Sequence, residues 1–157
     1  MSVRARSVAV AVLAAYVIFV LAVLLWPTPV DAPVDALLQR VLDAAHRRGV
    51  PAAVDYDTVE VAANVAMFVP VGALLAAALP AGRRWVAVVV CILLSAGGEA
   101  AQALLLPARF ASLGDIEANS TGGLIGWLIA VVAIAVLVGR GGRRSIRETP
   151  RRPTLNR

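Results

Sequence analysis

The chain has 157 residues, of which 60% are hydrophobic, and its mean hydropathy is +0.81. This composition excludes an ordinary soluble domain, and the length excludes more than one membrane bundle. The net charge of +5 comes from arginines that lie at the ends of apolar runs and in the C-terminal tail. That placement is typical of topology signals rather than of a nucleic-acid-binding surface. The single cysteine, Cys91, excludes a disulfide framework.

The first apolar run covers residues 7–26 and is long enough for one crossing of the bilayer. Arg4 and Arg6 precede the run, as they would in a signal peptide, but no small-residue cleavage site follows it. We therefore interpret residues 7–26 as a retained membrane anchor.

Residues 33–48 predict a short amphipathic helix between the first two spans. Apolar residues recur at helical spacing from Val34 to Ala45, and Gly49 and Pro51 end the pattern. Two placements of this helix are open. It lies on the membrane surface, or it packs as a lid over the bundle.

Three further apolar runs cover residues 59–79, 85–106 and 116–138. Pro70 lies inside the first of them and predicts a kink, because proline removes a backbone donor. Gly122, Gly123 and Gly126 predict a close approach of the last run to a neighbouring helix. The sequence thus predicts an all-α fold in which residues 1–138 form a four-helix transmembrane bundle.

The arginines predict the orientation of this bundle. Arg83 and Arg84 lie in the short connection between the second and third spans, and residues 139–157 carry seven arginines. The positive-inside rule places these segments and both termini in the cytoplasm, and the amphipathic helix outside. The basic C-terminal segment is expected to be a disordered tail near anionic headgroups.

Three pairs of polar residues lie near the outer ends of the last three predicted spans, and the members of each pair share one helical face: Glu60 and Asn64, Glu99 and Gln102, and Asp115 and Asn119. Counting residues from the expected helix boundaries places Asn64, Gln102 and Asn119 at one depth and Glu99 one turn deeper. Hydrogen bonds between helices explain the amides, at roughly 0.6–2 kcal/mol each. A carboxylate buried in the membrane needs a further partner that offsets its charge, such as Arg109, a bound cation or a proton.

These residues also carry a family resemblance. The motifs, in chain order, are Glu60-x3-Asn64-x3-Phe68-x-Pro70-x-Gly72, Ser95-x3-Glu99-x2-Gln102 and Arg109-x5-Asp115-x3-Asn119-x2-Gly122-x3-Gly126. Together they resemble the VanZ-like family of small multi-pass bacterial membrane proteins, which is named for an accessory factor of teicoplanin resistance. The resemblance covers residues 8–138. It implies a four-helix domain in the bacterial cytoplasmic membrane and, for the named member, reduced sensitivity to glycopeptide antibiotics.

One position departs from the family pattern. Glu117 follows Asp115 at a place where an apolar residue would be more usual. Whether Asp115 or Glu117 is the acid that the site uses therefore stays open at the level of sequence.

Two hypotheses for function follow from the polar residues. In the first, the protein is a cell-envelope factor that binds a lipid-linked wall precursor or a lipoglycopeptide in a polar pocket at the outer leaflet. The residues expected to contact that ligand are Glu60, Asn64, Gln102, Arg109 and Asn119. Arg109 would engage a phosphate or a carboxylate of the ligand.

In the second hypothesis, the protein is an intramembrane enzyme that acts on a lipid or a wall precursor. Glu99 and Asp115 would be the catalytic acid and base. No cofactor is required, although Glu60, Glu99 and Asp115 together could hold a divalent cation. A transporter is disfavoured because four spans are few and no inverted repeat is visible. The oligomeric state is open.

Overall fold

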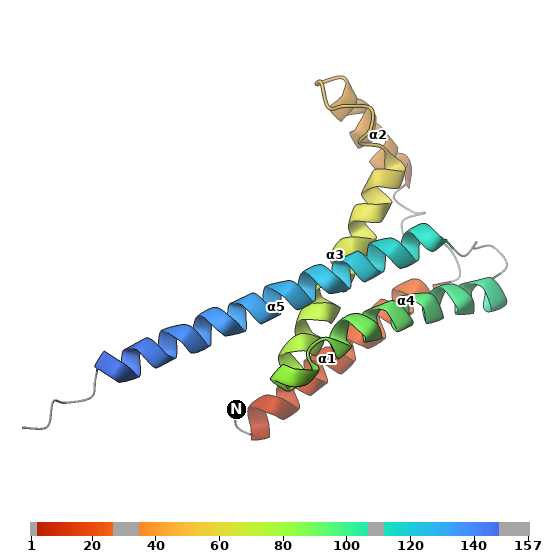
Figure 1. Cartoon of the computed structure of the whole chain (residues 1–157). Coiled ribbons are helices and arrows are strands. Elements are labelled where there is room, and N and C mark those ends of the chain that lie inside the picture. Colours follow the sequence, from red (N-terminus) through yellow and green to blue (C-terminus); the bar gives the residue numbers. More distant parts are fainter. Residues whose placement is uncertain (1–2, 27–34, 107–111, 148–157) are drawn as a thin grey trace, which may run out of the picture.

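The computed structural model describes residues 3–26, 35–106 and 112–147. Within these ranges the elements are all helical, which confirms the predicted all-α class: α1 (Val3–Leu24), α2 (Asp35–His46), α3 (Tyr56–Ala78), the short 3-10 helix η1 (Ala81–Arg83), α4 (Val86–Leu105) and α5 (Leu113–Arg147) (Figure 1).

Three stretches of the described chain are long and apolar enough to cross a membrane. They are Tyr56–Ala78, Ala81–Leu105 and Leu113–Arg140, and α1 contributes a shorter apolar stretch, Val10–Leu24. Large apolar side chains such as Ile18, Leu93 and Leu128 are exposed on the surface of these helices. Such a surface suits helices that face lipid instead of water. The number of crossings, four, stays a prediction.

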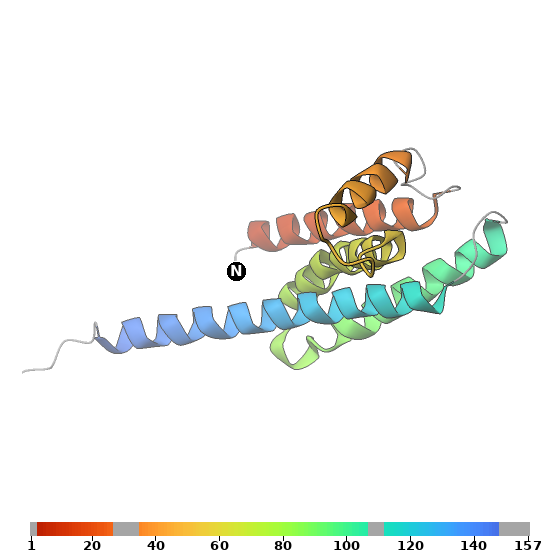
Figure 2. The ribbon, with the colours of Figure 1, turned by 90° about the horizontal axis from the view of Figure 1, so that it is seen from above.

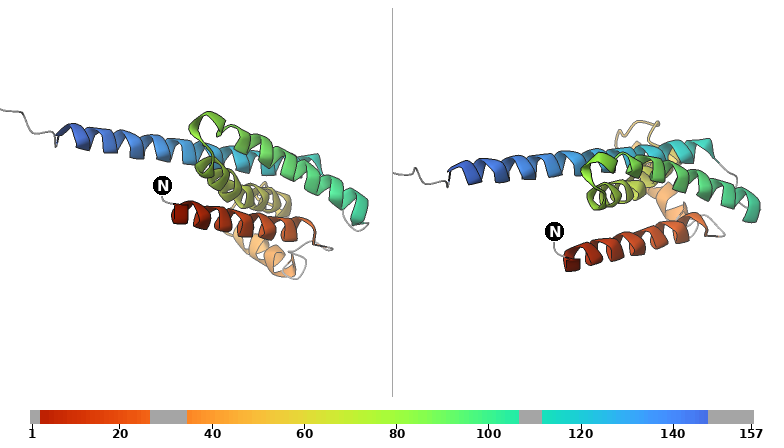
Figure 3. Two further views of the ribbon diagram at one scale, coloured as in Figure 1. Left: turned by 90° about the horizontal axis from the view of Figure 1, so that it is seen from below. Right: turned by 60° about the horizontal axis from the view of Figure 1, so that its bottom comes forward.

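α3 is the central helix of the bundle. It has its most extensive contacts with α5 and also packs against α1 and α4. Figures 2 and 3 show α1 on one side of α3 and α5 on the other. Val20, Phe68 and Cys91, from α1, α3 and α4, are fully buried together in the core. The Tyr16 hydroxyl also ties α1 to α3 by donating to the Met67 carbonyl oxygen at 3.0 Å.

α3 and α5 cross in backbone contact through the glycine seam, which comprises Gly72, Gly122, Gly123 and Gly126. A Cβ atom on Gly122 would collide with the Val65 carbonyl oxygen, and one on Gly126 would collide with the Val69 carbonyl oxygen. Small residues spaced four apart permit this approach in membrane helices. The expectation of a close approach at these glycines is therefore confirmed.

The helix boundaries differ from the predicted ones at several ends, most of all at α5. α5 begins at Leu113 instead of 116, and it continues past 139, the expected start of the tail, to Arg147. Residues 139–147 contain no proline, and their four arginines favour a helix, whereas their three glycines disfavour it. α3 remains one helix through Pro70. Gly49 has a φ of 94°, a left-handed conformation that favours glycine and suits the end of the α2 segment.

Candidate polar site at one end of the bundle

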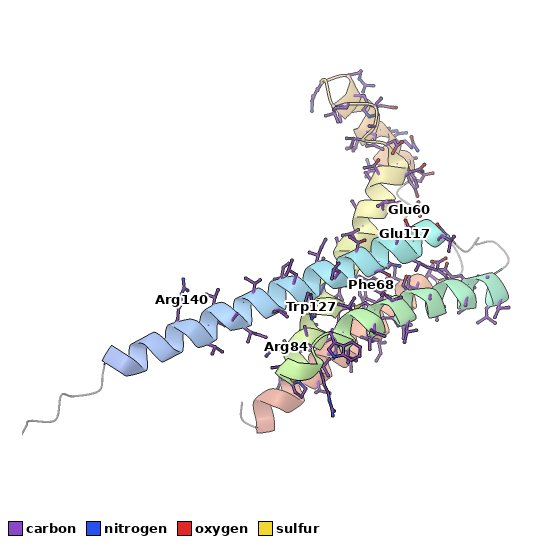
Figure 4. The ribbon with its side chains drawn as sticks, viewed as in Figure 1. Glu60, Phe68, Arg84, Glu117, Trp127 and Arg140 are labelled. Atoms are coloured by element: carbon purple, nitrogen blue, oxygen red, sulfur yellow. The ribbon has the colours of Figure 1, made fainter. Side chains whose placement is uncertain are left out.

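Four of the polar residues predicted from sequence lie where α3 begins, α4 ends and α5 begins: Asn64, Glu99, Asp115 and Asn119. Figure 4 shows Glu60 and Glu117 at this end, whereas Arg84 and Arg140 lie toward the opposite end. We use the name polar cluster for the residues linked there by hydrogen bonds: Asn64, Ser95, Glu99, Ser112, Asp115 and Asn119.

Asn64 and Asp115 join α3 to α5. The Asn64 amide nitrogen Nδ2 donates to Asp115 Oδ1 at 2.9 Å, and the pair is partly buried. Glu117 is exposed on the surface of α5, and so is Glu60, one turn before Asn64 on α3. Of the two neighbouring acids at the start of α5, Asp115 is therefore the one that faces the cluster.

Glu99 of α4 contacts the N-terminus of α5. Its side chain is only 3% exposed, and its Oε2 accepts a hydrogen bond from the Ser112 backbone N–H at 2.7 Å. The first amides of a helix have no partner within the helix, and that end carries a partial positive charge. This position stabilises a buried carboxylate.

Ser112 organises the first turn of α5. Its Oγ accepts a hydrogen bond from the Asp115 backbone N–H at 3.3 Å, as an N-capping serine does. In a capping box, the side chain of the acidic residue three positions after the N-cap accepts a hydrogen bond from the backbone N–H of the N-cap residue. Here Glu99 accepts from that amide, and Asp115 accepts from Asn64 instead. One serine thus links the two acids and positions both of them.

Asn119 lies one turn further along α5 and is fully buried. Its Nδ2 donates to the Ser95 hydroxyl oxygen at 3.0 Å. Within the described residues, Asn119 Oδ1 and the neighbouring Ser120 Oγ are buried and have no hydrogen-bond partner. A buried polar atom without a partner costs about 1–3 kcal/mol. Asn119 Oδ1 is therefore the incompletely satisfied atom of the polar cluster, and Ser120 lies next to it in the chain.

The predicted depths need a correction. Residue counting placed Glu99 one turn deeper than Asn119. In the structure, Ser95, one turn deeper than Glu99 on α4, is the residue that meets Asn119. The reason is that α5 begins at Leu113, so Asn119 lies further along the helix than a start at 116 implies.

Gln102 is directed toward α1. It is buried, and its Nε2 donates to the Leu24 carbonyl oxygen at 2.6 Å. Leu24 ends α1, where the last carbonyl groups have no partner within the helix. Gln102 therefore joins α4 to α1. The sequence predicted that this amide group contacts a ligand, but its Nε2 donates to Leu24 instead. Arg109, the predicted cation, lies outside the described residues.

The described residues offer no cage for a metal ion. No group of three or more His, Cys, Asp or Glu side chains among them could hold one. Glu60, Glu99 and Asp115 thus do not form a carboxylate site of the kind that hard cations prefer.

Sequence reasoning missed Ser112 and Ser120. A signal for Ser112 was present, because Ser112-x2-Asp115 before an apolar run is a capping-box pattern. No comparable signal marks Ser120, whose burial depends on how α5 is rotated against its neighbours.

Comparisons with known proteins bear on the same region. The model of the family described as VanZ/LLP1 matches residues 13–135, a range that includes the whole polar cluster and the glycine seam. No curated protein and no solved structure matches the chain.

Proposed function

We propose that this chain, which belongs to the VanZ/LLP1 family, is an integral membrane protein of the bacterial cell envelope that binds a lipid-linked ligand at its polar cluster. The ligand class is a lipid-linked wall precursor or a lipoglycopeptide. By binding it, the protein would change the sensitivity of the cell to glycopeptide antibiotics.

The orientation is part of the proposal. Arg84 and Arg140 lie toward one end of the bundle, and Glu60 and Glu117 lie at the other (Figure 4). The positive-inside rule supports four crossings of the cytoplasmic membrane with both termini in the cytoplasm. The polar cluster then lies at the outer leaflet, where lipid-linked wall precursors are used.

The observation that carries the proposal is the unpartnered acceptor of Asn119. An apolar side chain at this buried position would pack without an unsatisfied oxygen. The unpartnered oxygen supports a binding role for Asn119, in addition to the hydrogen bond by which its Nδ2 joins α5 to Ser95 of α4. A ligand with hydroxyl or amide N–H groups would supply the missing donor to Asn119 Oδ1. Asn64 and Glu60, and Arg109 by prediction, would surround the same ligand, while Gln102 holds α4 in place.

A binding measurement tests this proposal. The protein would be placed in lipid nanodiscs and titrated separately with teicoplanin and with a lipid-linked disaccharide–peptide wall precursor. We expect one probe to bind, and Asn119→Leu to weaken that binding by at least about ten-fold, which is about 1.4 kcal/mol. Thr121→Val, an exposed change on the same helix, is the matched control. Absence of binding by both probes, or equal binding by Asn119→Leu, would contradict the proposal.

A second candidate function is acid/base catalysis on a lipid or wall precursor. It is favoured by the unlike environments of Glu99, which is buried against a helix N-terminus, and Asp115, which is partly buried against Asn64. Glu99→Gln separates the two functions. Binding should survive this change, whereas turnover by an acid/base enzyme should fall by about 100-fold or more.

A further inference from the structure

α2 leaves part of its apolar face uncovered. Leu42 is buried, whereas Leu37 and Val41 are 60% and 55% exposed. The polar residues Gln39 and Asp43 lie on the opposite side of the helix. α2 thus has an apolar flank, formed by Leu37 and Val41, that the described part of the chain leaves mostly exposed.

The aromatic residues before and after α2 indicate the depth of this helix relative to the membrane surface. Trp26 follows the end of α1 and is 55% exposed, and Tyr56 is the first residue of α3. Tryptophan and tyrosine are enriched where a membrane span meets water. The chain therefore leaves the apolar layer at Trp26 and returns to it at Tyr56, with α2 between these two points.

The direction of α2 agrees with this level. Figure 1 shows α2 running across the direction of α1 at the end of the bundle where α3 begins. A helix that runs across the spans at their end lies along the plane of the membrane surface. α2 packs on α3 and extends away from the start of α5, so it does not cover the polar cluster as a lid would.

We infer that α2 is an interfacial helix whose partner is the phospholipid surface at the end of the bundle where α3 begins. Leu37 and Val41 insert among the upper acyl chains, and Gln39 and Asp43 face water, as in other amphipathic helices at membrane surfaces. The contact continues the lipid-facing surface of α3, where Val61 is exposed. This inference depends on membrane insertion of the chain and not on a ligand at the polar cluster.

Spin-label accessibility tests this placement. In a Cys91→Ala background, Val41→Cys and Asp43→Cys would each carry a nitroxide, in vesicles of phosphatidylcholine and phosphatidylglycerol. We expect the label at 41 to be several-fold more accessible to oxygen than to a water-soluble nickel chelate, and the label at 43 to show the reverse order. Leu37→Cys and Gln39→Cys provide a second matched pair, also at exposed positions.

Two outcomes would overturn the inference. Equal access of the chelate to both labels would place α2 in water. Shielding of the label at 41 from both reagents would mean that protein, such as a second copy of this chain, covers the flank. Binding of teicoplanin or of a wall precursor has no part in these measurements, so they stand or fall separately from the proposed function.

Discussion

α3 and α5 meet in two regions with different chemistry. In the glycine seam, backbone touches backbone, and Gly72, Gly122 and Gly126 leave no space for even a Cβ atom. In the polar cluster, the hydrogen bond between Asn64 and Asp115 joins the same two helices, and buried oxygens of Asn119 and Ser120 lack partners among the described residues. Backbone contact closes the seam, although Trp127 Nε1, next to Gly126, is also buried without a partner among the described residues.

The difference separates stability from function. Close packing without cavities or unsatisfied atoms is what folding selects. Buried polar atoms that remain unpaired lower stability, and proteins tend to retain such local conflicts at functional sites. The seam should therefore control whether the bundle forms, and the cluster should control what the bundle does.

The largest effect is expected in the seam. Gly126→Val would force a branched side chain against the Val69 carbonyl oxygen, which belongs to a helix backbone and cannot rotate away. We expect a loss of about 3 kcal/mol or more, or no folded protein at all, measured by thermal unfolding in detergent. Gly97→Ala is the control, since a Cβ atom there meets nothing within 4 Å. A normal melting temperature for Gly126→Val would show that the seam does not hold the bundle.

A smaller loss of stability is expected for a change in the hydrogen bond by which the polar cluster joins α3 to α5. Asp115→Ala removes the acceptor of Asn64 and leaves that amide without its partner. The expected loss is about 1–2 kcal/mol. Glu117→Ala, two residues away and exposed, should change the melting temperature much less. Equal effects of the two changes would mean that the Asn64–Asp115 bond adds nothing to stability.

The sharpest test of the comparison is Asn119→Leu. The change removes an oxygen that has no partner together with one hydrogen bond to Ser95. The two contributions oppose each other, so the free energy of unfolding should change by less than about 1 kcal/mol, although ligand binding falls. A large destabilisation would instead assign Asn119 to the scaffold.

The smallest effect is expected outside the membrane. Asp55 caps α3 by accepting from the Thr58 backbone N–H at 2.9 Å. This hydrogen bond holds the pKa of Asp55 below its ordinary value of 3.8. A lowered pKa in the folded state means that the cap stabilises at neutral pH and weakens as the pH falls through the folded-state pKa.

Asp55→Ala should therefore lower the melting temperature slightly at neutral pH. The difference from the parent protein should shrink as the pH approaches and passes below 3.8. A difference that stays constant across this range would exclude the ionised cap as its source.

Sequence alone determined the features that depend on local pattern. Runs of apolar residues predicted α1, α3, α4 and α5, because the length and hydrophobicity of a span are properties of the segment itself. The spacing of Gly122 and Gly126 predicted a close helix contact for the same reason. The ordered polar motifs indicated the family, which the match over residues 13–135 supports.

The tertiary structure alone decided which polar groups meet. The rotation of each helix about its axis determines which side chains come together. It makes Asp115, and not Glu117, face Asn64. It also brings Ser112 to Glu99 and Gln102 to Leu24. Because an α-helix turns once in about 3.6 residues, an error of three residues in the start of α5 shifts its partners by nearly one turn. Composition and spacing do not contain that information, since rotation is set by contacts between helices distant in sequence.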